Sequence, residues 1–226
     1  MLLTVQNLAK SYASGARAVD VLRDVSFTVA QGETVALEGE SGSGKSTVLH
    51  LIAGLDAPTG GSIVLDGIEV AGLPDAQSAA LRRTTVGVVF QQFNLVPSLT
   101  VRANIAFHAR LGEKFDAEWS EHLADQIGLA EHLDKYPEAL SGGQQQRVAI
   151  ARTLAAKPKL ILADEPTGNL DETTADIVMG LMLDSVQDVG AAVLMVTHSP
   201  RQAARMDRRL TLSHGTVQEA APASIT

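Results

Sequence analysis

The pattern of apolar positions divides the chain into strand-like ends and a helical middle. Short runs rich in Val, Ile and Leu occur on both sides of residues 100–156, as expected for strands that are buried on both faces. Within residues 100–156 the apolar positions recur with the period of a helix. The predicted strands are 2–8, 21–29, 33–39, 60–67, 85–92, 159–166 and 191–198, with a terminal hairpin over 208–220. The predicted helices are 45–55, 75–83, 100–111, 116–129, 142–155, 172–187 and 199–206.

This order of elements predicts an α/β core into which an all-helical lobe is inserted. Three helices of the lobe begin at residues that favour helix N-termini, namely Thr100, Asp116 and the Ser-Gly pair at 141–142.

Composition narrows the kind of protein. The 226 residues are 45% hydrophobic and 19% charged, contain no cysteine and carry a formal net charge of −8. Disulfides and thiolate metal sites are therefore excluded, in keeping with a reducing cytosol. The negative charge argues against non-specific nucleic-acid binding, and we interpret the basic run 201–209 as a solvated helix face. No apolar run is long enough to span a bilayer, and the N-terminus lacks the features of a signal peptide.

The stretch "GESGSGKST" predicts a phosphate-binding loop. Residues 39–46 match the pattern G-x-x-x-x-G-K-[ST], with an apolar strand before it and a helix after it. Glycines let backbone N–H groups wrap phosphate oxygens, Lys45 can reach the β and γ phosphates, and the Ser46 hydroxyl can ligate Mg²⁺. The alternative is a Gly-rich turn without a ligand. The predicted loop residues are Gly39, Glu40, Ser41, Gly42, Ser43, Gly44, Lys45, Ser46 and Thr47.

An acidic pair follows the apolar run "LILA". Asp164 is predicted to hold Mg²⁺, and Glu165 to accept a proton from an attacking water. An Asp-Glu pair after a strand can also be a helix cap or a turn, but its combination with a phosphate loop favours catalysis.

A second Gly-rich turn opens a helix at "LSGGQQQRVAIA", residues 140–151. With "LSGGQ", "DEPTGNLD" at 164–171 and "VTHS" at 196–199, the chain resembles the ATP-binding-cassette (ABC) ATPases over nearly its whole length. The resemblance implies a head-to-tail homodimer with two ATP molecules. Each ATP lies between the phosphate loop of one copy and the signature residues Ser141, Gly142, Gly143 and Gln144 of the other.

The resemblance assigns four further residues. Tyr12 matches the aromatic residue that stacks on adenine, although a tyrosine on a strand is commonly plain packing. Gln91 matches the glutamine that reaches Mg²⁺ and the attacking water, and His198 the histidine that contacts the γ phosphate. Asp171 matches a loop that crosses the dimer interface, and could equally cap the helix that follows. One departure is Ser199, where many relatives have aspartate.

The resemblance also implies a fold: a RecA-like P-loop NTPase core with an antiparallel β subdomain and an inserted α-helical subdomain. The core and the β subdomain would comprise residues 1–91 and 158–226, and the helical subdomain residues 92–157.

The residues within and around these motifs also resemble those of the subfamily of macrolide-efflux, lipoprotein-release and haem-export ATPases. Such a protein would sit on the cytoplasmic face of the membrane, bound to an integral membrane permease that chooses the cargo. The apolar stretch 93–107 is where relatives receive a coupling helix of the permease. The alternative is a soluble ABC ATPase that acts on nucleic acid or ribosomes, which would need an inserted arm or a basic face.

Overall fold

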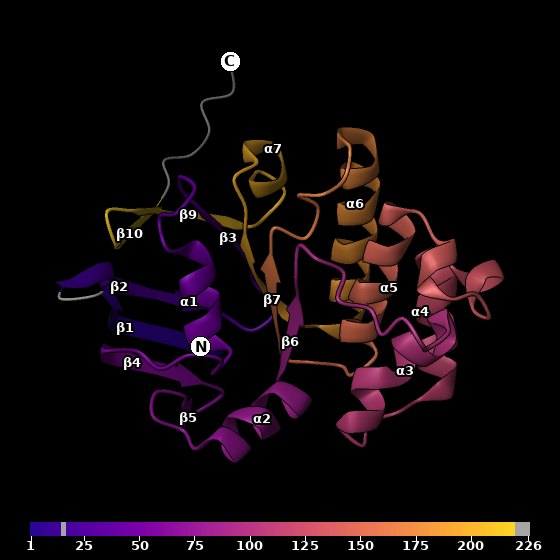
Figure 1. Ribbon diagram of the computed structural model, residues 1–226, viewed down its shortest axis with the longest axis horizontal. Coiled ribbons are helices and arrows are strands. Elements are labelled where there is room, and N and C mark those ends of the chain that lie inside the picture. Colours follow the sequence, from indigo (N-terminus) through magenta and orange to yellow (C-terminus); the bar gives the residue numbers. More distant parts are fainter. Residues whose placement is uncertain (15–16, 220–226) are drawn as a thin grey trace. The chain divides into compact units, whose positions relative to one another are not determined.

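The computed structural model describes residues 1–14 and 17–219, and the chain forms two compact units (Figure 1). The first unit contains residues 1–79 and 192–226, and the second contains residues 80–191. The subdomain boundaries expected from the sequence, with a helical part over 92–157, remain a prediction.

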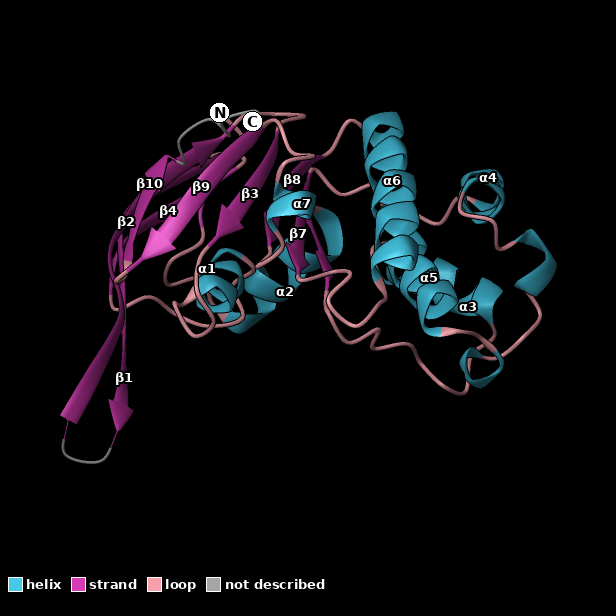
Figure 2. Cartoon of the chain, turned by 90° about the horizontal axis from the view of Figure 1, so that it is seen from above, coloured by secondary structure: helices cyan, strands magenta, loops and turns pink. Residues whose placement is uncertain are grey.

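The first unit is built on a mixed sheet with the strand order β5-β4-β1-β2-β10-β9-β3-β8. Strands β1, β2, β4 and β5 pair antiparallel, whereas β3 pairs parallel with both β8 and β9. The long β1–β2 hairpin reaches beyond the other strands of its sheet (Figure 2). The strands are β1 (Leu3–Ser14), β2 (Arg17–Val29), β3 (Thr34–Glu38), β4 (Gly60–Leu65), β5 (Ile68–Glu69), β8 (Ala192–Val196), β9 (Arg208–Ser213) and β10 (Thr216–Glu219).

Helix α1 (Lys45–Ile52) lies on one face of this sheet (Figure 2). The helix packs against β8, every residue of which is buried. A short helix, α7 (Pro200–Ala203), follows β8, and α2 (Asp75–Thr84) begins in the first unit and ends in the second. The central strands of the unit are thus covered, as their uninterrupted apolar sequences predict.

The second unit combines a pair of parallel strands, β6 (Val86–Val89) and β7 (Leu160–Asp164), with helices. Helix α5 packs against both α3 and α6. The helices are α3 (Val101–Leu111), α4 (Ala117–Gln126), α5 (Gly142–Leu154) and α6 (Glu172–Val189), with 3₁₀ turns at Ala130–His132 and Pro137–Ala139. Side chains of Thr100, Asp116 and Ser141 accept hydrogen bonds from the first turns of α3, α4 and α5, which confirms the predicted helix starts.

Several elements differ from the sequence-based prediction. Strand β1 continues to Ser14, beyond the predicted strand 2–8. Strand β2 begins at Arg17, before the predicted strand 21–29. Their outer part, which includes "AKSYAS", has little apolar alternation and is joined by the antiparallel ladder instead. The terminal hairpin was predicted correctly, and its last predicted residue, Ala220, lies outside the described residues. Among residues 1–14 and 17–219, no helix combines the length and apolar character that crossing a bilayer requires.

The interpretation of residues 201–209 as a helix face was wrong. Helix α7 ends at Ala203, and Arg208 and Arg209 lie on β9. The two N–H groups of Arg209 donate to both carboxylate oxygens of Glu38 at 2.8 and 3.0 Å. Strand pairing therefore brings acidic partners from distant parts of the sequence to these arginines. Such contacts cannot be predicted from the residues near 201–209 alone.

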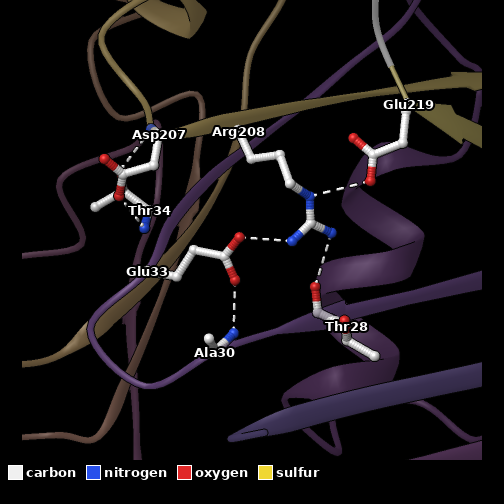
Figure 3. A network of polar contacts seen from close by, with 7 residues as sticks. All are labelled: Thr28, Ala30, Glu33, Thr34, Asp207, Arg208 and Glu219. Atoms are coloured by element: carbon white, nitrogen blue, oxygen red, sulfur yellow. Dashed lines mark hydrogen bonds and ion pairs between the residues drawn. The ribbon is translucent and has the colours of Figure 1, made fainter.

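Arg208 connects three segments of the first unit (Figure 3). Its guanidinium contacts Glu33 at 2.5 Å, the backbone oxygen of Thr28 at 2.9 Å and Glu219 at 3.1 Å. The other carboxylate oxygen of Glu33 accepts a hydrogen bond from the N–H of Ala30 at 2.6 Å. The end of β2, the turn before β3 and the end of β10 are thereby tied to β9, and this fixes the start of the strand that leads into the phosphate loop.

Candidate active site

The predicted phosphate loop connects β3 to α1 in the first unit. Lys45 is only 6% exposed, and its ammonium donates to the carbonyl oxygens of Gly39 at 2.9 Å and Glu40 at 2.8 Å. A Cβ on Gly39 would overlap the carbonyl oxygen of Leu212 and lie 2.9 Å from Ser43 Oγ, so only glycine fits there. The loop is therefore folded tightly around the amine of Lys45.

Three observations show that this loop fits a phosphate group. Among the described residues, the Ser43 hydroxyl is a buried polar atom without a hydrogen-bond partner. The helical ladder begins with Val48 N–H donating to the backbone oxygen of Gly44 at 3.0 Å, so the N–H groups of the first turn point toward the loop at the N-terminal end of the helix. Carbonyl dipoles hold Lys45, and a phosphate would be a stronger, charge-assisted partner.

His198 lies at the same edge of the sheet as the phosphate loop. Strands β3 and β8 are parallel, with Leu37 opposite Val196, so both chains leave the sheet on the same side. The imidazole is exposed two residues beyond Val196. The hydroxyl of Ser199 accepts from Gln202 N–H at 3.4 Å and caps α7. Because aspartate and serine are both good caps, the departure at this position conserves the local structure.

Tyr12 lies on the β1–β2 hairpin, and its position is fixed by two neighbours. Its phenol donates to Asp56 at 2.8 Å, and the ammonium of Lys10 lies 4.6 Å from the ring centroid. Burial and the bond to Asp56 raise the pKa of Tyr12, so the phenol is neutral. Burial acts to raise the pKa of Asp56, but hydrogen bonds from Lys10, Tyr12 and Ala57 outweigh it and lower this pKa. Tyr12 as a whole is 40% exposed, so it is not packed into the core.

In the second unit, the strand ends bring Gln91 and the acidic pair together. Strands β6 and β7 are parallel, with Val89 opposite Ala163, so Gln91 and Asp164 leave the sheet at one edge. Glu165 has a φ of 45°, which is rare for a residue other than glycine. Its backbone oxygen accepts from the N–H of Gly168 at 2.9 Å and closes a tight turn. Strained conformations of this kind concentrate at functional sites.

The signature turn forms a capping box at the start of α5. Ser141 Oγ accepts from Gln144 N–H at 3.3 Å, and Gln144 Oε1 accepts from Ser141 N–H at 2.9 Å. Gln144 Nε2 donates to His132 Nε2 at 2.8 Å, a partner that the sequence did not reveal. Gly142 lies beside Phe93 and Leu170. The N–H groups of Gly142 and Gly143 lie in the first helical turn, at the end of a helix that suits an anion.

Asp171 caps α6 by accepting from Thr174 N–H at 3.0 Å, as its structural alternative predicts.

The same loop contains Asn169, which was not predicted from the sequence as a site residue. It lies two residues before Asp171 and exchanges hydrogen bonds with Gln91. Its only signal in the sequence was its place inside "DEPTGNLD".

The donor set expected for a metal consists of Ser46, Gln91 and Asp164. A hydroxyl, an amide oxygen and a carboxylate are all hard oxygen ligands, which Mg²⁺ prefers. Each of these residues therefore fits Mg²⁺ in its chemistry.

Comparisons with known proteins agree with this set of features. A family model described as "ABC transporter" matches residues 22–168. The lipoprotein-releasing system ATP-binding protein LolD of Shewanella frigidimarina (strain NCIMB 400) is 42% identical over 228 residues, which cover 100% of this chain and 95% of that protein. Two solved structures of MJ0796 are each 35% identical and cover 97% of this chain and 99% of theirs. One is a dimeric post-hydrolysis state of this ATP-binding cassette bound to ADP and Pi, with a TM-score of 0.87. The other is a dimeric structure of the bacterial ABC transporter cassette, with a TM-score of 0.86.

Proposed function

Because the chain belongs to the ABC transporter family, we propose that it powers a membrane permease through ATP-driven dimerisation. It is the ATP-binding and ATP-hydrolysing subunit of a transport system. The observation that carries the proposal is the buried ammonium of Lys45, enclosed by a loop whose Ser43 hydroxyl is buried without a hydrogen-bond partner among the described residues. The alternative of a soluble machine acting on nucleic acid or ribosomes is set aside, because the relatives are transport ATPases and the net charge is −8.

Within this site each residue has a chemical role. Lys45 binds the β and γ phosphates, and Ser46, Gln91 and Asp164 hold Mg²⁺. When bound, the metal neutralises charge on the β and γ phosphates. Glu165 orients the attacking water and accepts its proton, and His198 binds the γ phosphate. Proton transfer thus rests on Glu165, the acidic side chain next to a metal ligand.

The active form is a head-to-tail homodimer. Each ATP bridges residues 39–47 of one copy and residues 141–144 of the other, with Tyr12 stacked on adenine and Asp171 at the interface. The support is chemical: both segments begin helices, so each presents the N–H groups of a first helical turn and the positive end of a helix dipole. Two positive half-sites repel each other until the γ phosphate lies between them.

The dimer is tested by changes at Ser141. Ser141→Arg is expected to place bulk and a positive charge in the signature turn, so that ATP no longer drives dimerisation while each monomer still binds ATP. Sedimentation with ATP, in a background that cannot hydrolyse it, measures the dimer. Calorimetry measures binding.

A second variant separates helix capping from interface chemistry. Ser141→Asp retains a side-chain acceptor for the capping box but places a carboxylate against the γ phosphate, so it should also prevent dimers. Ser98→Arg, at an exposed loop serine, is the matched control and should dimerise normally. ATP-dependent dimers of both Ser141 variants would show that the signature turn does not act across subunits.

The second partner is an integral membrane permease, which holds the chain at the cytoplasmic face of the membrane. The loop between Gln91 and α3 supports this docking site. Leu95 and Val96 are half-buried apolar side chains, and the buried amide of Asn104 anchors the backbone of Val96 through bonds of 2.9 and 3.1 Å. A rigid backbone that presents apolar side chains is suited to receive a helix.

Changes in this loop test the permease contact. Leu95→Asp or Val96→Asp is expected to weaken copurification with the permease and to abolish the rise in ATP hydrolysis that the permease causes, because a charge enters an apolar contact. ATP binding to the isolated chain should stay normal. Leu111→Asp, at an apolar residue that is 53% exposed, is the control. Normal copurification of both loop variants would place the docking surface elsewhere.

The cargo follows from the permease. One relative is named for a lipoprotein-releasing system and is 42% identical over its matched length. We therefore assign a hydrophobic cargo that is extracted from the membrane, with a lipoprotein as the leading candidate and haem or a macrolide as other members of the same chemical class.

A further inference from the structure

Two side chains of the second unit exchange hydrogen bonds at the edge where β6 and β7 end. Gln91 Nε2 donates to Asn169 Oδ1 at 3.1 Å. In return, Asn169 Nδ2 donates to the backbone oxygen of Gln91 at 3.0 Å. Asn169 therefore contacts both the side chain and the main chain of the same glutamine, across 78 positions of sequence.

This pair fixes the orientation of the Gln91 amide. The backbone oxygen of Gln91 can only accept, so the Asn169 group facing it must be the NH₂. Asn169 Oδ1 then faces the Gln91 side chain, and because an oxygen can only accept, Gln91 must present its own NH₂ to it. The remaining end of the Gln91 amide is Oε1, which is the atom that a metal ion or the hydrogen of a water would contact.

The surroundings leave little freedom for another arrangement. A Cβ on Gly168 would lie 2.9 Å from Gln91 Nε2 and 3.3 Å from Glu165 Oε2, so both side chains pass close to this glycine. The main chain around Gln91 is held independently of Asn169, by side chains of helix α5. Gln146 donates to the backbone oxygen of Phe90 at 3.4 Å, and Arg152 donates to those of Phe93 and Asn94 at 3.1 and 2.7 Å. Helix α5 thus fixes the backbone, while Asn169 orients the amide.

We propose that Asn169 is a positioning residue for ATP hydrolysis, which holds the Gln91 amide with Oε1 directed at the metal and the attacking water. This inference rests on the proposed role of Gln91. Asn169 acts through Gln91 and contacts neither the nucleotide nor the reacting water. Because Asn169 lies between Glu165 and Asp171, the orientation of Gln91 depends on the conformation of the loop that crosses the dimer interface.

The test is a double-mutant cycle in single-turnover hydrolysis. Asn169→Ala is expected to slow hydrolysis about tenfold with ATP affinity unchanged, because a freely rotating amide presents Oε1 only part of the time. In a Gln91→Ala background, Asn169→Ala should have no further effect, since the group that it orients is gone. Gln187→Ala, an exposed residue on α6, is the control and should be as active as the wild type.

A nuclear magnetic resonance measurement reads the orientation without relying on activity. The side-chain amide signals of Gln91 are identified as those lost in the Gln91→Ala spectrum of the ¹⁵N-labelled, nucleotide-free chain. In Asn169→Ala these signals should shift toward the positions of exposed glutamines and broaden or sharpen with the new motion. Gln187→Ala should leave them unchanged.

The outcomes distinguish this inference from the proposed function. If Gln91→Ala hydrolyses ATP normally, the role of Gln91 is wrong and the inference falls with it. If Gln91→Ala is slow but Asn169→Ala is normal, or if the two defects multiply, the positioning role alone is overturned. Unchanged Gln91 amide signals in Asn169→Ala would also overturn it.

Discussion

Glu165→Gln is expected to lower the rate of ATP hydrolysis by roughly a hundred- to ten-thousand-fold, the usual contribution of a general base. Glutamine has the shape of the native side chain but lacks the carboxylate that accepts a proton. Lys45, Gln91 and His198 cannot replace it as a base in the assigned roles. ATP binding should persist, and the ATP-bound dimer should last longer because the step that opens it is blocked.

Single-turnover hydrolysis and a dimer assay on the same preparation measure both effects. Glu138→Gln, at an exposed carboxylate outside the site, should behave as the wild type. The left-handed backbone at Glu165 is a further reason to choose glutamine, which has a similar shape and avoids introducing a β-branched side chain at a φ of 45°. Near-normal turnover would remove Glu165 from the mechanism and make His198 the next residue to test.

Lys45→Ala is expected to weaken ATP binding by roughly a hundredfold or more. The ammonium would donate to two phosphate groups, and each such charge-assisted bond is worth about 1.5–3 kcal/mol, where 1.4 kcal/mol corresponds to a factor of ten in affinity. Calorimetry gives the dissociation constant. Equal affinity of the variant and the wild type would disprove the phosphate-loop assignment.

Two controls distinguish a loss of phosphate binding from a loss of folding. Lys45 is buried and bonded to the loop carbonyls of Gly39 and Glu40, so the melting temperature of the nucleotide-free variant must be compared with that of the wild type. Lys135→Ala removes an exposed lysine of the second unit and should bind ATP normally. A variant that melts normally and binds no ATP would isolate the role of the charge.

The sequence predicted the elements that have strong local signals. The helix starts at Thr100, Asp116 and Ser141 were predictable because a cap is made within a few residues of the chain. Strands buried on both faces, such as 192–196, were predictable from their apolar composition. The outer part of the β1–β2 hairpin was missed because cross-strand hydrogen bonds, rather than an apolar pattern, hold it.

Contacts between segments that are distant in the chain could not be predicted from the sequence. The interpretation of residues 201–209 failed because Glu33 and Glu38 reach these arginines only through strand pairing. Asn169 was overlooked for the same reason: its partner Gln91 is 78 positions away. His132, which bonds Gln144, sits in a 3₁₀ turn that has no periodic pattern. By contrast, the phosphate loop could be predicted from the spacing of its motif residues, and the role of each of these residues stays a prediction.

The capping box at Ser141 has a consequence for the thermodynamics of association. Its hydroxyl, the Gln144 amide and His132 are already bonded to one another before a second copy arrives. Freezing a flexible side chain at an interface costs about 0.5–1.5 kcal/mol of conformational entropy. A signature turn that is rigid in the monomer avoids most of that cost and loses no order when the dimer separates. In the proposed dimer, the free energy of association would then depend more on the charge of the bridging nucleotide than on ordering of the signature turn.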